Sequence, residues 1–196
     1  MSPDQVIPWT WGLWLISWFA AAGWSSRTAR RPDAVRESVY RVLTAAGAIL
    51  LFGHPNWRWL SATVWRPGNA TRWALVVVTM CGLAFTWWAR IVLGRLWSSG
   101  VTRKVDHEVI MAGPYRFVRH PIYSGIILAV LATAVVQGTE SALLGAALIV
   151  LGTFMKARVE ESFLRRELGE DRYDAYARRV PMFVPFTRES PLKPDP

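Results

Sequence analysis

Five stretches rich in apolar residues, separated by polar and charged segments, set the pattern of this sequence. They cover residues 5–26, 38–52, 73–89, 122–136 and 141–155. A membrane-spanning helix needs about 20 mostly apolar residues, and the first stretch has 22 positions without a charge and several Trp residues that suit interfacial anchors. The turn at residues 137–140 joins the last two stretches. We therefore predict an all-α integral membrane protein with about five transmembrane helices, of which the last two form an antiparallel hairpin.

The composition supports a membrane protein. Of the 196 residues, 52% are hydrophobic, 12 are Trp and only 19% are charged, whereas soluble domains average about 25% charged residues. By length the chain is one domain, in which we assign 1–100 to three spans with their loops, 101–186 to the hairpin with its flanking polar segments, and 187–196 to a tail. One cysteine and three scattered histidines exclude a disulfide framework and predict no metal site.

Lysine and arginine residues are distributed unevenly between the two ends of the predicted helices. Eighteen of the 23 lie in the segments 27–36, 95–119 and 156–193, which fall on one side of the membrane. The opposite side has only Arg58, Arg66 and Arg72. Loops rich in Lys and Arg stay in the cytoplasm, so we expect the N-terminus outside and the C-terminus in the cytoplasm. This distribution accounts for the net charge of +9 without a nucleic-acid partner.

Two polar segments flank the predicted hairpin, at residues 107–125 and 156–181. Because the hairpin is antiparallel, both segments return to the same membrane face, and we expect His120 and Glu160 to lie close together in space. Carboxylates that face Arg, His and Tyr side chains would bind a small zwitterionic or cationic ligand. The plainer alternative is a solvated helix end with surface ion pairs and interfacial aromatic anchors.

Two sequence elements distinguish between these alternatives. The first reads Gly113-Pro114-Tyr115-Arg116-x-x-Arg119-His120-Pro121-x-Tyr123-x-Gly125, and the second has Glu160-Glu161 followed by Gly169-Glu170 and Arg179-Val180-Pro181. At this separation they resemble the signature of the isoprenylcysteine carboxyl methyltransferase family, over roughly residues 107–186. The resemblance implies a membrane methyltransferase that uses S-adenosylmethionine and binds it without a Rossmann fold, and the sequence has no Gly-x-Gly-x-x-Gly motif after a strand.

The resemblance also implies roles for individual residues. The implied cofactor contacts are His107, Glu108, Val109, Ile110, Tyr115, His120, Pro121, Ile122, Tyr123, Glu160 and Glu161. Carboxylates suit the ammonium group of the methionine part, and Tyr rings can stack on adenine or face the sulfonium. The arginine with which the family binds its substrate carboxylate aligns with Lys156, which lacks the bidentate grip of arginine. We therefore consider Lys156, Arg158 and Arg119 together as candidate catalytic residues.

These observations predict an enzyme that methylates a lipophilic small molecule or lipidated substrate in contact with membrane lipids. A carboxylate is the first choice of acceptor, because it is ionised at neutral pH and needs no general base. Three alternatives stay open: a phospholipid N-methyltransferase, a sterol-type reductase with a nicotinamide cofactor, and a non-catalytic membrane scaffold. Outside the motif, we expect Cys81 to be a packing residue, Arg90 to reach the interface from a helix end, and His54 to lie in a loop.

Overall fold

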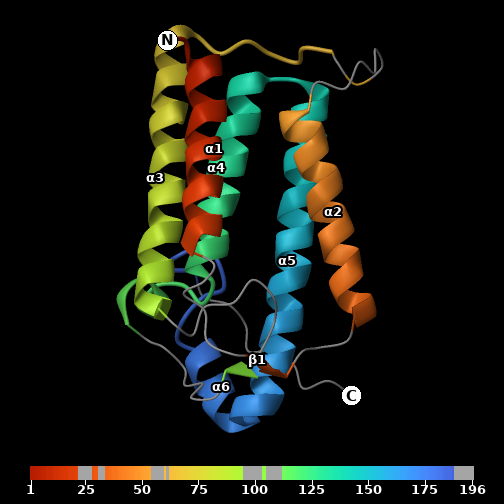
Figure 1. The fold of residues 1–196 in the computed structure, drawn as a ribbon. Coiled ribbons are helices and arrows are strands. Elements are labelled where there is room, and N and C mark those ends of the chain that lie inside the picture. Colours follow the sequence, from red (N-terminus) through yellow and green to blue (C-terminus); the bar gives the residue numbers. More distant parts are fainter. Residues whose placement is uncertain are drawn as a thin grey trace.

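The computed structural model describes residues 1–21, 28–30, 34–53, 60, 62–94, 103–104 and 112–187, and most of them are helical (Figure 1). The helices are α1 (Pro3–Ala20), α2 (Ala34–Phe52), α3 (Asn69–Leu93), α4 (Pro121–Gln137), α5 (Glu140–Leu168) and α6 (Glu170–Ala177), with a 3-10 helix, η3, at Gly113–Arg116. The four later apolar stretches lie within α2, α3, α4 and α5, and the first coincides with α1 as far as Ala20. The helical class and the hairpin are therefore confirmed.

Two short strands, β1 (Thr28–Arg30) and β2 (Arg103–Lys104), pair antiparallel and connect two segments that are far apart in the sequence. They are not predicted from the sequence, because a ladder of three and two residues is too short to leave an alternating pattern of apolar and polar positions.

The long helices form two halves that meet at the α4–α5 hairpin. Helices α1, α3 and α4 lie side by side in one half, and α2 packs along α5 in the other (Figure 1). Within the described residues, α3 and α5 are long and apolar enough to cross a membrane, whereas α4 is a shorter apolar helix. At 1.5 Å per residue, α3 and α5 extend roughly 37 and 43 Å. The count of five spans remains a prediction.

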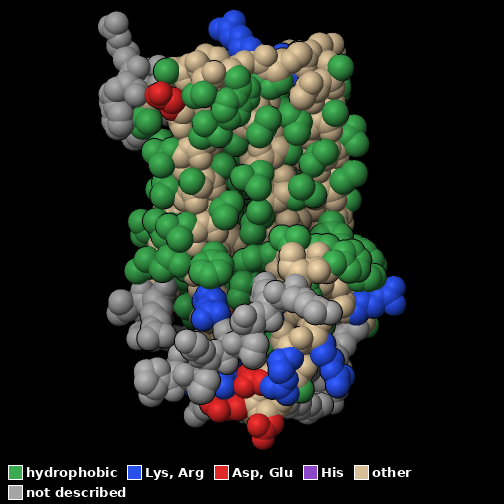
Figure 2. Space-filling view, turned by 180° about the vertical axis from the view of Figure 1, so that it is seen from behind, with side chains coloured by type: hydrophobic (Ala, Val, Ile, Leu, Met, Phe, Trp, Pro, Cys, Tyr) green, Lys and Arg blue, Asp and Glu red, His purple; other side chains and the backbone are tan. Residues whose placement is uncertain are grey.

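The outer surface of the helices is apolar over most of their length. Figure 2 shows hydrophobic side chains over the body of the molecule, while most acidic and basic side chains gather at the end that carries α6. Ile16, Phe19 and Ile91 are 60–70% exposed, whereas Thr86 and Ala129 are completely buried. Large apolar residues outside and small residues inside are the arrangement expected for helices surrounded by lipid.

Tryptophans of α1 make contacts inside the bundle that the sequence pattern does not reveal. The Nε1 atom of Trp11 donates a hydrogen bond to Oγ1 of Thr133 in α4 over 3.0 Å, and that of Trp14 donates to Oγ1 of Thr86 in α3 over 2.8 Å. The prediction of interfacial anchors is wrong for these two residues, because their indole N–H groups find hydroxyl partners between helices.

Arg90 also differs from its prediction. Its side chain is 2% exposed, lies 4.4 Å from the ring centroid of Trp18 and donates from Nη2 to the carbonyl of Ala21 over 2.6 Å. It therefore ties α3 to the end of α1 instead of reaching the interface. Cys81 lies exposed on α3, not packed inside, and His54 is outside the described residues.

Glycines allow the helices of each half to approach until their backbones touch. A Cβ atom added to Gly125 of α4 would lie 2.4 Å from the carbonyl oxygen of Gly82 in α3, and one added to Gly145 of α5 would lie 2.7 Å from that of Gly47 in α2. Side chains at these positions would force the helices apart, so the glycines set the helix spacing.

The contact at Gly125 makes a prediction about stability. Gly125→Ala should lower the free energy of unfolding by roughly 1–3 kcal/mol, the usual cost of overpacking, and we would measure this by unfolding the protein in detergent. Gly12→Ala is the matched control, because a Cβ there meets no atom within 4 Å. Equal stability of the two variants would show that close packing of α3 on α4 is not required.

Candidate functional site

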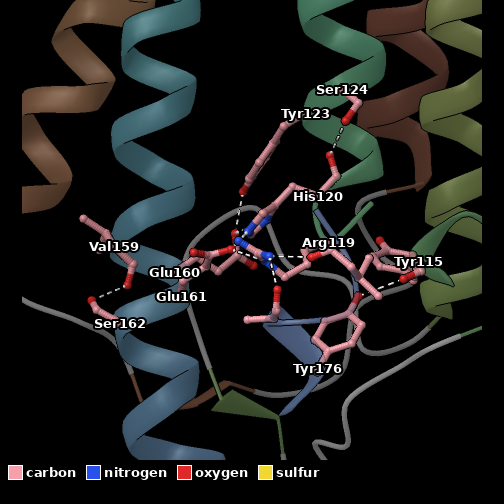
Figure 3. Close-up of polar contacts among 12 residues, drawn as sticks. Tyr115, Arg119, His120, Tyr123, Ser124, Val159, Glu160, Glu161, Ser162 and Tyr176 are labelled. Carbon is pink, nitrogen blue, oxygen red and sulfur yellow. Dashed lines mark hydrogen bonds and ion pairs between the residues drawn. The ribbon is translucent and has the colours of Figure 1, made fainter. Parts of the chain in front are cut away.

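The turn between α4 and α5 determines which ends of the two helices meet. Gly138 ends α4 in the left-handed conformation (φ 60°), and the Oγ1 atom of Thr139 accepts a hydrogen bond from the backbone N–H of Ala142 at the start of α5. The chain thus reverses within two residues. At the other end, Nε2 of His120 lies 3.1 Å from Oε1 of Glu161 (Figure 3). The predicted proximity of the two polar segments is confirmed.

A buried ion pair lies at the centre of the site. The Nε atom of Arg119 donates to Oε1 of Glu161 over 2.7 Å, and these side chains are only 4% and 2% exposed. Nη1 of Arg119 also donates to the carbonyls of Ala177 and Val180, at 2.9 and 2.5 Å. Arg119 therefore binds α5, the end of α6 and the segment that follows α6.

This following segment runs across the start of α4. The backbone N–H of Arg119 donates to the carbonyl of Pro181, the N–H of His120 donates to that of Met182, and Oγ of Ser124 donates to that of Phe183. The lengths are 2.8, 3.1 and 2.7 Å. These bonds fix the backbone of His120 in a non-helical conformation just before α4 begins, and they direct its ring towards α5.

The second half of the site is more open. The hydroxyl of Tyr123 donates to Oε2 of Glu160 over 2.7 Å, and Nδ1 of His120 lies 3.9 Å from the same oxygen. The rings of His120 and Tyr123 are stacked, with centroids 5.3 Å apart. The side chain of Glu160 is 30% exposed, in contrast to 2% for Glu161. The two adjacent glutamates therefore have different surroundings: one is enclosed by protein and the other faces an accessible space.

Lys156 lies one helical turn before Glu160, between two aromatic rings. Its Nζ atom is 5.3 Å from the ring centroid of Tyr123 and 6.0 Å from that of Tyr40. Ammonium groups bind favourably over the faces of such rings. Tyr40 belongs to α2, so a helix outside the recognised motif also borders the site.

Tyr115 lies on the side of η3 that faces α6. The hydroxyl of Tyr176 donates to the backbone carbonyl of Tyr115 over 2.8 Å. Burial raises the pKa of both phenols above its ordinary value, so both groups stay protonated at neutral pH. This hydrogen bond therefore holds η3 against α6 without depending on pH in the physiological range.

The structure brings together most of the predicted site residues. Those that meet at the end of the hairpin are Arg119, His120, Tyr123, Lys156, Glu160 and Glu161, with Pro121 and Ile122 in the first turn of α4. Arg158 is exposed. It follows Lys156 by two residues, which is a rotation of about 200° around the axis of α5, so the two side chains lie on different faces of the helix. His107, Glu108, Val109 and Ile110 lie outside the described residues. Sequence reasoning missed Tyr40, because no motif or spacing links α2 with α5.

An apolar groove between α4 and α5 leads to this site. Its volume is about 540 Å³, and it is lined by Ile127, Leu131, Ala134, Val135, Leu143, Ala146, Ala147, Val150, Leu151, Phe154 and Phe183. The ring of Phe183 stands at one end, with its centroid 6.4 Å from that of Phe154 and 6.0 Å from that of His120. Phe183 therefore separates the apolar groove from the polar site.

Fold and site together define an all-helical protein with apolar outer surfaces and a polar site at one end of a helical hairpin. The profile of the isoprenylcysteine carboxyl methyltransferase (ICMT) family matches residues 74–166 of this chain.

Similar proteins carry several functional names. The chain is 31% identical to the nickel-cobalt-cadmium resistance protein NccN of Alcaligenes xylosoxydans xylosoxydans, over 76% of this chain and 64% of that protein. It is 30% identical to methanethiol S-methyltransferase 1 of Bradyrhizobium diazoefficiens, over 84% of this chain and 59% of that protein. With protein-S-isoprenylcysteine O-methyltransferase B of Arabidopsis thaliana it shares 33% identity over 44% of each. The chain thus spans about three fifths of the length of the first two relatives.

Because Glu160 and Glu161 have different surroundings, we predict that removing the charge of each will change the stability of the protein by a different amount. Glu161→Gln removes the charge that balances buried Arg119, and breaking such a pair costs up to roughly 3–5 kcal/mol of unfolding free energy. Glu160→Gln, the matched control, weakens one partly exposed hydrogen bond and should cost about 1 kcal/mol. Unfolding in detergent measures both. If Glu161→Gln were as stable as Glu160→Gln, the buried pair would not support the fold.

Proposed function

We propose that this protein is a membrane methyltransferase that transfers the methyl group of S-adenosylmethionine to a lipophilic acceptor, with a carboxylate as the preferred nucleophile. The observation that carries the proposal is the cluster of His120, Tyr123 and Glu160 at the end of a hairpin that the ICMT family profile matches. The cluster adjoins an apolar groove, as an enzyme acting on a lipophilic acceptor requires.

The residues present fit the cofactor. Glu160 offers a partly exposed carboxylate for an ammonium group, and the stacked rings of His120 and Tyr123 offer aromatic faces for a sulfonium or an adenine. Oε2 of Glu161 is buried without a hydrogen-bond partner among the described residues, so the site retains an unused acceptor. When bound, the cofactor supplies a methyl group already activated by the positive sulfur.

A larger set of residues is assigned to cofactor binding in this proposal. It consists of His107, Glu108, Val109, Ile110, Tyr115, His120, Pro121, Ile122, Tyr123, Glu160 and Glu161. We assign Arg119 a positioning role, because its guanidinium is occupied by Glu161 and two backbone carbonyls.

The protein's own contribution to the reaction is alignment and exclusion of water. An ionised carboxylate needs no proton removed, so the site does not require a general base. Lys156, held between two tyrosine rings, supplies a positive charge that would attract and orient an anionic nucleophile. Arg158 is exposed and would act on the acceptor only before it enters the site.

The apolar groove is evidence that the acceptor carries a hydrocarbon chain. Its lining residues on α5 extend from Leu143 to Phe154, about 16 Å along the helix axis. Phe183 lies between the groove and the site, with its ring centroid 6.0 Å from that of His120. A hydrocarbon chain in the groove would bury apolar surface and bring its polar head to the site.

A thiol is a second candidate for the nucleophile. Two relatives are named methanethiol S-methyltransferases, and the first aligns with 84% of this chain. A lysine ammonium is a point charge and suits a single anionic atom such as a thiolate sulfur, whereas an arginine suits the two oxygens of a carboxylate. Nothing in the fold or the family favours the phospholipid, reductase or scaffold alternatives.

For topology, we propose five spans with the N-terminus outside and the C-terminus, together with the cofactor site, in the cytoplasm. The gathering of charged side chains at the end that carries α6 supports this orientation (Figure 2).

The topology is testable with reporters fused to the C-terminus. A reporter that is active only in the cytoplasm should be active on the full-length chain, and one that is active only outside should be silent. The reverse pattern would overturn the proposed orientation.

The function is tested by cofactor binding and product identification. The parent protein in detergent should bind S-adenosylmethionine by calorimetry, and His120→Ala, Tyr123→Phe and Glu160→Gln should each bind it about tenfold to a hundredfold more weakly, the loss expected for a hydrogen bond to a charged group. With labelled cofactor, lipophilic carboxylates and thiols compete as acceptors, and the labelled product identifies the nucleophile.

Arg158→Ala serves as the control, since an exposed residue should leave cofactor binding unchanged. Parent-like binding in both His120→Ala and Glu160→Gln would mean that the cofactor site is elsewhere. Binding of a nicotinamide cofactor in its place would favour the reductase.

A further inference from the structure

Tyr40 of α2 lies beside the site without belonging to the methyltransferase motif or to the residues matched by the family. We propose that Tyr40 is an acceptor-binding residue, whose hydroxyl and the ammonium of Lys156 together bind the two oxygens of an acceptor carboxylate. This inference rests on the proposed function and adds an α2 residue to the site.

The packing of α2 on α5 fixes Tyr40 next to Lys156. A Cβ atom added to Gly152 of α5 would lie 2.6 Å from Oγ1 of Thr44 and 3.0 Å from the backbone oxygen of Tyr40. Gly152 and Lys156 are four residues apart and therefore lie on the same face of α5. The backbone of Tyr40 thus rests on this face one turn from Lys156, whose Nζ atom lies 6.0 Å from the Tyr40 ring centroid.

The hydroxyl group of Tyr40 is available to bind a ligand. Tyr40 is only 4% exposed, and its hydroxyl oxygen is buried with no hydrogen-bond partner within 3.5 Å among the described residues, although the side chain of Arg41 interacts with it electrostatically. Buried hydroxyls normally have a partner, so one that lacks it beside a candidate site points to a ligand atom as its partner.

The chemistry of the two groups fits a carboxylate. Lysine supplies one charged donor where an arginine would supply two in a fixed plane. A neutral phenol next to the ammonium adds a second donor for the second oxygen. The neighbouring Glu37 and Arg41 of α2 form an i,i+4 ion pair, with Oε2 and Nη2 2.5 Å apart, and so largely neutralise each other.

The test uses a pair of ligands that differ only in the proposed contact: a prenylated cysteine analogue with a free carboxylate, and the same compound as a neutral carboxamide. Their dissociation constants are measured on the full-length protein in detergent, saturated with S-adenosylhomocysteine. Tyr40→Phe keeps the ring and removes the hydroxyl, so it should weaken binding of the carboxylate about tenfold to a hundredfold. Binding of the carboxamide should change less than threefold.

Tyr176→Phe is the matched control. It also removes the hydroxyl of a buried tyrosine, but one bonded to the Tyr115 carbonyl. A purely structural effect would lower the melting temperature and weaken both ligands alike, without changing the ratio of the two dissociation constants. Lys156→Gln is a second, independent variant, which should also reduce the preference for the carboxylate.

The outcomes separate this inference from the proposed function. If the parent prefers the carboxylate and neither Tyr40→Phe nor Lys156→Gln changes that preference, the acceptor carboxylate binds elsewhere and the inference fails while the function stands. If the parent does not prefer the carboxylate over the carboxamide, the two-donor site is refuted. Failure of the parent to bind S-adenosylhomocysteine would refute the proposed function itself.

Discussion

Arg119 and Glu161 carry opposite charges at a depth that solvent scarcely reaches, and further hydrogen bonds to protein groups help to offset the cost of burying such a pair. Arg119 meets this requirement with the carbonyls of Ala177 and Val180, and so draws the end of α6 onto the hairpin. Neighbouring residues on a helix point about 100° apart, so an inward Glu161 leaves Glu160 directed towards Tyr123 and the accessible space. The burial of the Glu161 carboxylate therefore leaves the carboxylate of Glu160 available to a ligand.

The hairpin and the meeting of its polar ends could be predicted because they depend on local signals: apolar length, a Gly-containing turn and two charged flanks. Contacts between helices that are distant in the sequence could not. Nothing in the sequence of α2 indicates that Tyr40 lies against Gly152, and the partners of Trp11 and Arg90 depend on how α1 crosses α3 and α4. In a membrane-type bundle the apolar pattern identifies helices but marks their inner and outer faces poorly, because lipid-facing and buried positions are both apolar.

The site has two parts of different origin. His120, Tyr123, Glu160 and Glu161 come from the hairpin, which the family profile matches. Tyr40 comes from α2, which lies before the matched residues. Under the proposed function, a division of this kind would allow one methyl donor to be used with different acceptors, because the helix beside Lys156 can differ while the motif stays the same. It agrees with the variety of names among the similar proteins.

The two arms of the hairpin are unequal in length. His120 precedes Gly138 by 18 residues and Glu160 follows it by 22, so at 1.5 Å per residue the longer arm overshoots by roughly 6 Å. Side chains on a helix tilt towards its N-terminus, so Glu160 and Glu161 point back along α5 and His120 points away from the turn, which closes this offset. Inserting or deleting one residue in either arm would rotate one partner by about 100° and separate the pair. The number of residues between the two motif elements is therefore as much a part of the site as the side chains themselves.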